Sequence, residues 1–466
     1  MSASTVGFDP RQPGTSEEHW WSAPQWADVP VLNMAALAAM FQSVLVVSAH
    51  PDDETLGAGG LLADLADAGM DITVLIATSG EKSHQVADES AASQLGTRRR
   101  REVEIAISAL APNAHMVHLG LPDTALHTHR ARLIEAVTDR VNASTLVIAP
   151  WTRDGHSDHD AIGEACAAAA SSASASVVHY PLWFWHWAEP EALPWSQVVS
   201  AEMSLVGCWR KRAALDAFVS QTRGWDQMPG GADTPPVVGP AVLRRARRLI
   251  EALIDTEGVL PRLSIVELER RSASRQATFD EMYDGDDDPW GWNGSFYEER
   301  RRALVVAMLG RQRYGRALEL GCANGHLTAA LEQRCDDVYA LDTSAQAVRA
   351  ASATAPNAHI VHGTLAADIP HGTFDLIVIS EVGYFLTAKE LIATVQAAKS
   401  SLADGGELLM CHWQHPTLDI PLDGVLVHEQ AEALMGRSPS ASYHDEDVSI
   451  LLWSSSSSVA EREGRR

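Results

Sequence analysis

The chain has 466 residues, too many for one ordinary hydrophobic core, so two or three domains are expected. Hydrophobic residues make up 46% of the chain, which indicates a globular protein, and no segment is long and apolar enough to span a bilayer. The net charge of −25 would repel phosphate backbones and anionic membranes, which argues against nucleic acids and membranes as partners.

The first 39 residues are rich in tryptophan and proline, and we expect them to form an irregular N-terminal extension. They begin with neither the basic segment nor the apolar segment of a secretion signal, so a cytoplasmic location is expected. The five cysteines are scattered without Cys-x-x-Cys spacing. This pattern predicts free thiols rather than a disulfide framework or a thiolate zinc site.

Two polar clusters each follow a short apolar run. The run at 44–47 leads into Ser-Ala-His-Pro-Asp-Asp-Glu at 48–54, and glycines follow it. The run at 145–149 precedes Asp-Gly-His-Ser-Asp-His at 154–159. Each pattern predicts a strand that ends in a polar loop, which places both clusters where open α/β sheets hold their chemistry. Imidazole and carboxylate groups are ligands that suit Zn²⁺, and two strand ends supply both.

Together these motifs closely resemble the zinc-dependent N-acetylglucosamine deacetylases of the PIG-L or LmbE-like family. The resemblance covers roughly residues 40–225. It implies an α/β domain of the Rossmann type over these residues, with a mostly parallel sheet and helices on both faces.

The resemblance also assigns roles within the two clusters. It implies that His50, Asp53 and His159 hold the metal. Asp52 would be the general base, and His156, in protonated form, would stabilise the oxyanion. Adjacent loop residues do not easily face one ion together, so one aspartate can bind the metal while its neighbour takes a proton from water.

The segments around and after this domain have simpler interpretations. The basic run at 98–101 is best interpreted as a solvated helix face. The aromatic run at 180–187 could wall a sugar pocket, but core packing or an interface is equally open. Residues 226–275 are predicted to be a helical linker, with a loop at 227–236 and an amphipathic helix at 240–254.

A second signature lies in the C-terminal half. A predicted strand ends in Glu-Leu-Gly-Cys-Ala-Asn-Gly at 319–325, a helix follows, and the next strand ends at Asp342. This is a nucleoside-binding pattern, because glycines let the backbone approach a ligand and the acid can bind ribose hydroxyls. The Glu-x-Gly-x-x-x-Gly spacing differs from that of a dinucleotide site, which disfavours NAD.

The pattern resembles the class I S-adenosylmethionine-dependent methyltransferases. Within them it is most similar to the NodS-like enzymes, which N-methylate the amine of a deacetylated chitooligosaccharide. The similarity spans roughly residues 276–430 and implies a second Rossmann-like α/β domain at 276–453. It rests on the motifs at 279–283, 288–290, 297–298, 319–325, 374–381 and 402–406.

This second resemblance implies which residues bind S-adenosylmethionine. Glu319, Gly321 and Gly325 would form the cofactor loop, and Asp342 would bind the ribose. Thr364 stands where many members have an acid near the adenine, so we include it among the cofactor-binding residues.

Two further features of this half bear on the predicted cofactor site. Ala323 replaces a glycine that is often found in the middle of the cofactor loop. The acidic run at 284–288 is most simply a solvated loop. Because it lies beside Trp290 and Trp292, we also hypothesise that this segment folds over the cofactor as a lid.

Two histidines near a predicted strand end leave alternatives open. His412 and His415 could serve the acceptor amine, but satisfied structural histidines are equally plausible. The serine-rich tail at 454–466 is expected to be disordered.

The two resemblances together imply a bifunctional enzyme that acts on a small-molecule amino sugar or glycoconjugate. Hydrolysis of an N-acetyl group exposes an amine, and an amine is the nucleophile that a sulfonium methyl donor requires. Two alternatives stay open: amide hydrolysis and O-methylation at different positions of a natural product, or a methyltransferase half that acts only as a cofactor-binding docking module. The oligomeric state is not predicted.

Overall fold

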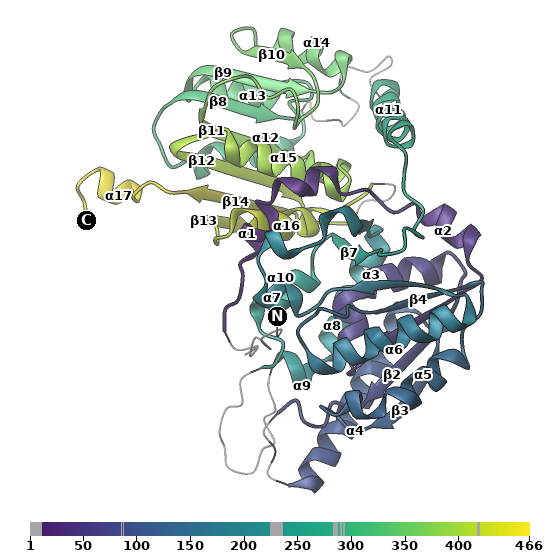
Figure 1. Cartoon of the computed structure of the whole chain (residues 1–466). Helices are drawn as coiled ribbons and strands as arrows, with labels where there is room; N and C mark the ends of the chain where they lie inside the picture. Colours follow the sequence, from purple (N-terminus) through teal and green to yellow (C-terminus); the bar gives the residue numbers. More distant parts are fainter. Residues whose placement is uncertain are drawn as a thin grey trace. The chain divides into compact units, whose positions relative to one another are not determined.

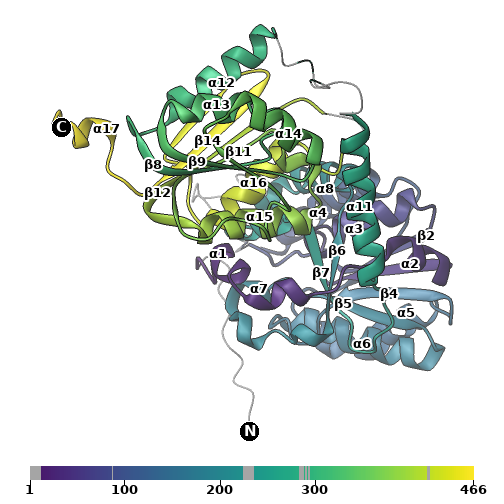
Figure 2. The ribbon, with the colours of Figure 1, turned by 90° about the horizontal axis from the view of Figure 1, so that it is seen from above.

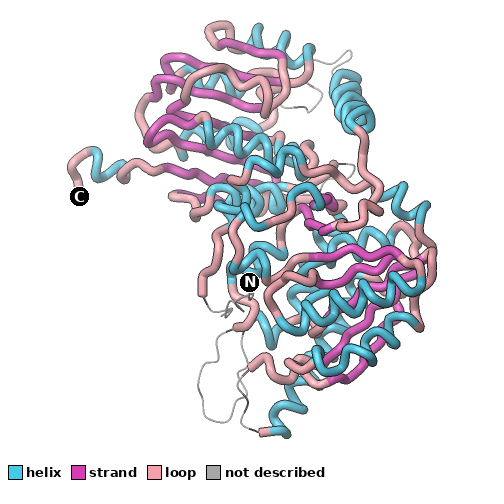
Figure 3. Tube along the Cα trace, in the orientation of Figure 1, coloured by secondary structure: helices cyan, strands magenta, loops and turns pink. Residues whose placement is uncertain are grey.

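The computed structural model describes residues 12–84, 86, 88–223, 236–282, 288, 291, 294–416 and 420–466. The chain divides into two compact units, Met1–Leu263 (unit 1) and Ser264–Arg466 (unit 2). In each unit the strands form one sheet with helices on either side (Figures 1 and 3). Across the described residues, no helix has the length and apolar character needed to cross a membrane.

Unit 1 is built on a seven-stranded sheet. Its strands are β1 (Ser43–Ser48), β2 (Asp71–Thr78), β3 (His115–Leu121), β4 (Thr145–Pro150), β5 (Ser176–Tyr180), β6 (Val198–Glu202) and β7 (Ile250–Ile254). Its helices are α1 (Glu17–Trp21), α2 (Met34–Met40), α3 (Asp53–Asp67), α4 (Glu89–Leu110), α5 (Arg130–Thr138), α6 (Ser157–Ala173), α7 (Phe184–Trp187), α8 (Leu205–Ala217), α9 (Val219–Thr222) and α10 (Pro240–Ala246), with 3₁₀ turns η1 (Pro24–Asp28), η2 (Leu126–His129), η3 (Pro190–Ala192) and η4 (Trp195–Gln197).

The strand order in unit 1 is β3-β2-β1-β4-β5-β7-β6. Strands β1 to β5 are parallel, and β7 runs antiparallel to both β5 and β6. Helices α3, α4 and α8 pack together, as do α5 and α6 (Figure 1). Val44 and Val46 of β1 belong to one core cluster, whereas Leu45 and Val47 belong to the other. The central strand is therefore buried on both faces, which explains its uninterrupted apolar run.

Unit 2 is also built on a seven-stranded sheet. Its strands are β8 (Tyr314–Leu320), β9 (Cys335–Asp342), β10 (His359–His362), β11 (Phe374–Ser380), β12 (Leu402–Trp413), β13 (Ala441–His444) and β14 (Val448–Ser454). Its helices are α11 (Ile265–Met282), α12 (Phe296–Met308), α13 (His326–Glu332), α14 (Ala345–Thr354), α15 (Ala388–Ser400), α16 (Gly424–Met435) and α17 (Val459–Arg462), with a 3₁₀ turn η5 (Gly383–Phe385).

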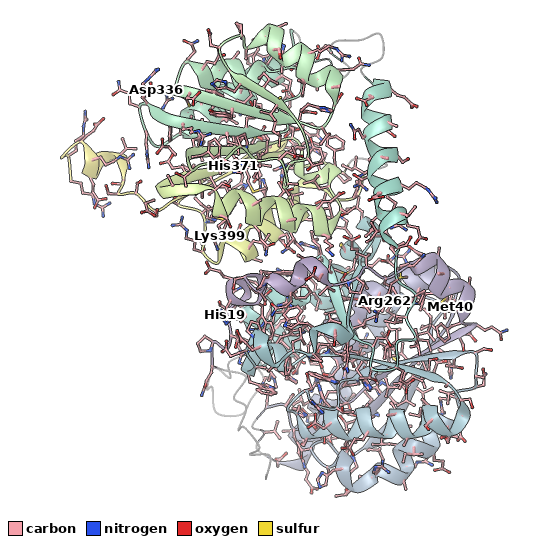
Figure 4. All side chains as sticks on the ribbon, turned by 45° about the horizontal axis from the view of Figure 1, so that its top comes forward. His19, Met40, Arg262, Asp336, His371 and Lys399 are labelled. Atoms are coloured by element: carbon pink, nitrogen blue, oxygen red, sulfur yellow. The ribbon has the colours of Figure 1, made fainter. Side chains whose placement is uncertain are left out.

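The strand order in unit 2 is β10-β9-β8-β11-β12-β14-β13. Counted from the first strand of each unit, both sheets have the same order, and both end in antiparallel strands. Helices α12, α13 and α14 cover one face, and α15 and α16 cover the other (Figure 2). Lys399 of α15 donates a hydrogen bond to the Leu434 carbonyl near the end of α16 (3.0 Å; Figure 4). The predicted fold class, two mostly parallel sheets with helices on both faces, is confirmed.

The predicted linker at 226–275 differs from the structure. Helix α10 ends at Ala246, and Ile250–Ile254 forms strand β7 between β5 and β6 rather than continuing the helix. A short apolar run fits a helix or a strand equally well, and here pairing with two neighbouring strands decides the outcome. Unit 1 therefore continues well beyond residue 225, and α11 already belongs to unit 2. Most of the predicted loop at 227–236 lies outside the described residues.

Residues 12–39 of the N-terminal extension pack into unit 1 as short helices and turns. Trp20 is fully buried, and its ring lies 4.7 Å from that of Trp185. Glu17 is buried between Arg245 and Arg248, with N–O distances of 2.8–3.0 Å. Trp185 comes from the aromatic run at 180–187, so the structure supports the core-packing interpretation of that run.

The C-terminal tail also differs from expectation. Residues 459–462 form helix α17, which begins with a capping box in which the Ser458 side chain and Glu461 bond reciprocally to the backbone. A Ser-x-x-Glu pattern of this kind satisfies two backbone N–H groups at a helix start. The expectation of disorder rested on the serine-rich composition and did not take the Ser-x-x-Glu pattern at 458–461 into account.

Candidate metal and cofactor sites

The first cluster lies on the turn between β1 and α3. Strand β1 ends at Ser48, and helix α3 begins at Asp53. Asp52 has a φ of 148°, a conformation that non-glycine residues rarely adopt. Such backbone strain, which costs on the order of 1–3 kcal/mol, is concentrated at functional sites. His50, Asp52 and Asp53 are all buried at this turn.

The second cluster lies between β4 and α6. His156 is the N-cap of α6, where its Nδ1 accepts the Asp158 backbone N–H at 3.3 Å. His159 lies in the first turn of α6 and has no exposed surface. Strands β1 and β4 are neighbours at the point where the strand order reverses. Open α/β sheets bind their ligands at this position.

The structure brings the three predicted metal ligands together. His159 Nε2 lies 3.3 Å from Asp53 Oδ1, and His50 Nδ1 lies 3.5 Å from Asp53 Oδ2. Ring nitrogens of His50, His156 and His159 all lie within 4.8 Å of one another. The cluster therefore places the imidazoles of His50 and His159, the imidazole of His156 and the Asp53 carboxylate around a common centre.

The hydrogen bonding of His159 fits a metal ligand. Its Nδ1 lies 2.8 Å from Asp154 Oδ2, and a carboxylate can only accept, so Nδ1 carries the proton. In the neutral imidazole its Nε2 is then the nitrogen with the lone pair, and this buried atom, 3.3 Å from Asp53 Oδ1, makes no hydrogen bond of good geometry among the described residues. A histidine that binds zinc through one ring nitrogen commonly donates the N–H of its other nitrogen to a carboxylate, a backbone carbonyl or water. The donor set therefore fits Zn²⁺.

Two carboxylates also lie close to the second ring nitrogen of His50. Its Nε2 lies 3.2 Å from Asp123 Oδ1 and 3.3 Å from Asp158 Oδ2. Burial opposes a charge on His50, but these carboxylates and Asp53 outweigh it, so the pKa of His50 lies well above its usual value. Asp123, Asp154 and Asp158 have no predicted role from the sequence, although Asp154 and Asp158 stand within the second motif.

Asp52 is held by a residue that the sequence analysis placed in solvent. Arg99 Nη2 lies 3.0 Å from Asp52 Oδ1 and also donates to the Pro51 carbonyl at 3.0 Å. Burial raises the pKa of Asp52 to about 7, against the opposing charge of Arg99. Arg99 is 2% exposed, so the prediction of a solvated basic face is wrong at this position.

Helical spacing could have identified Arg99. It lies four residues after Leu95 and four before Val103, and all three are buried. Residues at this spacing lie on one face of a helix, so Arg99 shares the apolar face of α4.

His156 differs from its predicted form. Burial, and then the positive charges of His159 and His50, lower its pKa to about 3. Because its Nδ1 accepts the Asp158 N–H, its Nε2 is the nitrogen that carries a proton. The structure thus presents His156 as a neutral hydrogen-bond donor rather than as an imidazolium.

In unit 2, the predicted cofactor loop is a tight turn after β8. Gly321 and Gly325 have φ values of 79° and 82°, in the left-handed region. A Cβ on Gly321 would lie 2.7 Å from the Val382 side chain, and one on Gly325 would lie 2.7 Å from Ala351 Cα. Both positions therefore require glycine, for conformation and for close packing.

The two predicted acids, Asp342 and Glu319, both lie next to this turn. Asp342 accepts the backbone N–H groups of Ala323 and Ser344, each at 2.9 Å. Glu319 is buried beneath the turn and accepts the Thr328 hydroxyl at 2.6 Å, and burial raises its pKa to about 8. Both acids thus lie at the carboxyl edge of the sheet, as the sequence predicted.

Thr364 follows Gly363, whose backbone N–H donates to the Asp342 carbonyl at 3.0 Å. It follows β10 and is exposed, and its backbone N–H and hydroxyl both donate to Asp368, at 2.7 and 2.9 Å. Its predicted place near an adenine stays a prediction.

A pocket opens beside the glycine turn. Its lining includes Gly321 and Cys322 from the turn, Ser380 at the end of β11, Glu381 after it, and Arg302 of α12. Glu319 also contributes to its wall. Strands β8 and β11 are neighbours where the strand order reverses, so the pocket occupies the same position in unit 2 as the metal cluster does in unit 1.

The structure decides between the two interpretations of His412. Its Nε2 accepts the Gly383 N–H at 3.1 Å, and its Nδ1 lies 2.9 Å from His428 Nε2. It is fully buried, so it is a structural histidine. His415 bonds to Asp447 at 2.9 Å and is partly exposed. Trp290, Trp292 and most of the hypothesised lid lie outside the described residues.

Comparisons with known proteins match both halves of the chain. Residues 45–170 match the family model of PIG-L, GlcNAc-PI de-N-acetylase, and residues 277–413 match that of NodS, nodulation protein S. A 1D-myo-inositol 2-acetamido-2-deoxy-alpha-D-glucopyranoside deacetylase of Rhodococcus jostii (strain RHA1) is 30% identical over 164 residues, which cover 30% of this chain and 56% of that protein. The chain spans 27% to 58% of the length of such curated relatives.

Two solved structures are similar to the C-terminal half. A putative methyltransferase from Pseudomonas syringae is 39% identical, with 34% of this chain and 99% of that chain covered and a TM-score of 0.31. The N-methyltransferase NodS from Bradyrhizobium japonicum WM9, in complex with S-adenosyl-L-homocysteine, is 20% identical, with 40% and 96% covered and a TM-score of 0.33. From the family models, the chain carries a PIG-L deacetylase domain toward its N-terminus and a NodS-like methyltransferase domain toward its C-terminus.

Proposed function

We propose that this protein removes the N-acetyl group of an amino sugar or glycoconjugate with a zinc-dependent site in unit 1, and that unit 2 then methylates the exposed amine with S-adenosylmethionine. The observation that carries the proposal is the presence, on one chain, of a histidine–carboxylate cluster and a glycine-turn pocket at equivalent edges of two sheets. The name of the curated relatives, which describes an acetamido-glucopyranoside, supports the substrate class of unit 1.

In unit 1, His50, Asp53 and His159 would hold the ion. Zn²⁺ at this position would polarise an amide carbonyl and lower the pKa of bound water. Asp52 is the candidate general base, because it is buried beside Asp53 and held by Arg99. His156 would donate a hydrogen bond from Nε2 to the oxygen on which negative charge develops.

In unit 2, the glycine turn and Asp342 would bind the nucleoside part of the methyl donor, as such turns do in nucleoside-binding folds. The turn at Gly321 lets a ligand approach the backbone, and the adjoining pocket leaves room for the reacting end of the donor and for an acceptor.

The chemistry of the acceptor links the two reactions. The lone pair of an acetamide nitrogen is delocalised into its carbonyl, so this nitrogen is a poor nucleophile toward a sulfonium methyl group. Hydrolysis of the amide releases an amine whose lone pair is available. Methylation on nitrogen should therefore follow deacetylation.

Product masses from four reactions test this order. The Asp52→Asn variant, given an acetylated amino sugar and the methyl donor, should yield no methylated product, whereas the same variant given the free amino sugar should methylate it. The Asp342→Ala variant should accumulate the free amine from the acetylated sugar, and the wild-type protein should produce the methylated amine. Methylation of the acetylated sugar by Asp52→Asn would favour O-methylation instead. Absence of methylation in every reaction would favour a docking role for unit 2.

A further inference from the structure

We propose that Glu381 is the acceptor-binding residue of unit 2: its carboxylate binds the amine and takes up the proton released after methyl transfer. This inference rests on the proposed function of unit 2 as an amine methyltransferase, and it assigns the group that handles the acceptor.

Topology places Glu381 at the functional edge of the sheet. In unit 1, the polar residues follow β1 and β4, the two strands between which the strand order reverses. The equivalent strands of unit 2 are β8 and β11. The cofactor turn follows β8, and Glu381 is the first residue after β11. Glu381 lines the same pocket as Gly321 and Cys322 of that turn.

The backbone of Glu381 is strained. Its φ is 57°, in the left-handed region, although glutamate carries a Cβ that disfavours this conformation. Its backbone N–H donates to the Cys411 carbonyl of β12 at 2.9 Å, which holds the strained residue in place. A strained non-glycine residue in a pocket at a strand end is a recognised indication of function.

The carboxylate of Glu381 accepts hydrogen bonds from the protein and can still accept others from a ligand. The Tyr384 hydroxyl donates to Oε2 at 2.8 Å, and the Trp413 backbone N–H donates to Oε1 at 2.9 Å. Each carboxylate oxygen can accept a second hydrogen bond. Burial raises the pKa of Glu381, and the nearby charge of Arg301 opposes that rise.

A second observation indicates that a polar ligand group binds close by. The hydroxyl of Tyr297, on α12, is buried and has no hydrogen-bond partner among the described residues. The Tyr297 ring lies 5.3 Å from that of Trp413, whose backbone N–H donates to Glu381, so Tyr297 and Glu381 both lie beside Trp413. Buried polar groups in native proteins are nearly always paired, and a bound acceptor would supply the missing partner.

The chemistry of the step balances. The amine nitrogen forms a bond to the methyl carbon while the carbon–sulfur bond breaks, and the electron pair of that bond stays on sulfur. The donor leaves as a neutral thioether, and the methylated nitrogen carries the positive charge. This nitrogen then passes one proton to the Glu381 carboxylate, from which the proton reaches solvent. A carboxylate next to the nitrogen also stabilises the charge that develops there.

The Glu381→Gln variant tests the assignment in the full-length protein. The glutamine oxygen can still accept from Trp413, and its amide can donate to the Tyr384 oxygen, so both contacts persist while the charge and the basic oxygen are lost. With glucosamine as the acceptor, we expect kcat/KM for methylation to fall about 10²- to 10⁴-fold. S-adenosylhomocysteine affinity, measured by calorimetry, should stay within about twofold, and the melting temperature should not change.

Two further variants separate catalysis from structure. Tyr384→Phe removes one donor to Glu381 and should give an intermediate loss of methylation. Glu299→Gln, on the exposed surface of α12, should leave methylation at the wild-type level.

Two results would overturn the assignment: wild-type methylation of glucosamine by Glu381→Gln, or a large loss of S-adenosylhomocysteine affinity in that variant, which would make Glu381 a cofactor ligand. Failure of the proposed function is distinguishable, because the wild-type protein itself would then methylate no amine in an amino-sugar panel.

Discussion

His159 Nδ1 lies 2.8 Å from Asp154 Oδ2, and neither side chain is exposed to solvent. The Asp154 carboxylate also accepts the backbone N–H groups of Leu182, Trp183 and Phe184, at 2.7–3.0 Å. One buried aspartate therefore orients a candidate metal ligand and fixes the start of the aromatic run. If His159 binds a metal, this arrangement would couple that binding to the local fold.

The first prediction follows from this pair. Asp154→Asn keeps the size of the side chain but leaves too few acceptor oxygens for His159 and the three backbone groups. Zinc affinity, measured by competition with a chelator, should fall about 10- to 100-fold. Glu164→Gln, exposed on α6, the helix that carries His159, is the matched control and should bind zinc normally. Unchanged zinc affinity in Asp154→Asn would show that this contact does not orient a ligand.

The second prediction distinguishes the ligands from the base. His159→Ala should lose bound zinc and deacetylation together but retain binding of S-adenosylhomocysteine to unit 2. Asp52→Asn should retain zinc, while its deacetylation rate should fall about 10²- to 10⁴-fold because the proton acceptor is gone. Metal analysis and rates on the same preparations give both quantities. Loss of zinc from Asp52→Asn would mean that the roles of the two aspartates are reversed.

The third prediction concerns the stability of unit 2 as a function of pH. Burial raises the pKa of Glu319 to about 8, whereas an unfolded glutamate has a pKa of about 4.3. Between these values the folded state holds a proton that the unfolded state has released. The free energy of unfolding should therefore fall as pH rises through this window, by at most about 1.4 kcal/mol per pH unit from this group.

Glu319→Gln should remove this contribution, so the variant should gain stability relative to wild type as pH rises from about 5 to 8. Hydrogen exchange of peptides from β8 reports on unit 2 in the intact chain. Glu299→Gln is the exposed control. An identical pH dependence in Glu319→Gln and wild type would contradict the burial argument.

The fourth prediction concerns Ala323, the residue that replaces a loop glycine. Its φ is 47°, so it pays a steric cost of about 1–2 kcal/mol that glycine avoids. Replacing Ala323 with glycine would remove this cost, but glycine is more flexible in the unfolded chain, which offsets part of the stabilisation. Ala323→Gly should therefore stabilise unit 2 by about 0.5–1 kcal/mol.

A glycine placed in a regular helix gives the matched comparison. Ala330→Gly, within α13, should destabilise unit 2 by about 1 kcal/mol. Denaturant unfolding of the two variants should shift in opposite directions. A loss of stability in Ala323→Gly would show that the Ala323 methyl group makes a packing contribution larger than the strain.

Local patterns in the sequence were sufficient to locate both sites. Each candidate site follows a predicted strand, and residues such as His50 or Gly321 are recognised by their type and their distance from that strand's end. The β1 run is apolar because this central parallel strand is buried on both faces, so its signal is local and strong, whereas β8 contains Arg316 and Glu319 and is marked by the glycine turn that follows it. The fold class followed from the same strand–helix alternation.

Tertiary contacts decided what local patterns could not express. Ile250–Ile254 became a strand because two neighbouring strands offered it hydrogen bonds, and Arg99 was buried because a folded partner, Asp52, was available to it. The pairing of Asp154 with His159 and the position of Glu381 beside the cofactor turn also depend on chain segments brought together by the fold. The sequence by itself determined the chemistry present at each strand end, whereas the three-dimensional packing determined which groups are paired, buried and left free to react.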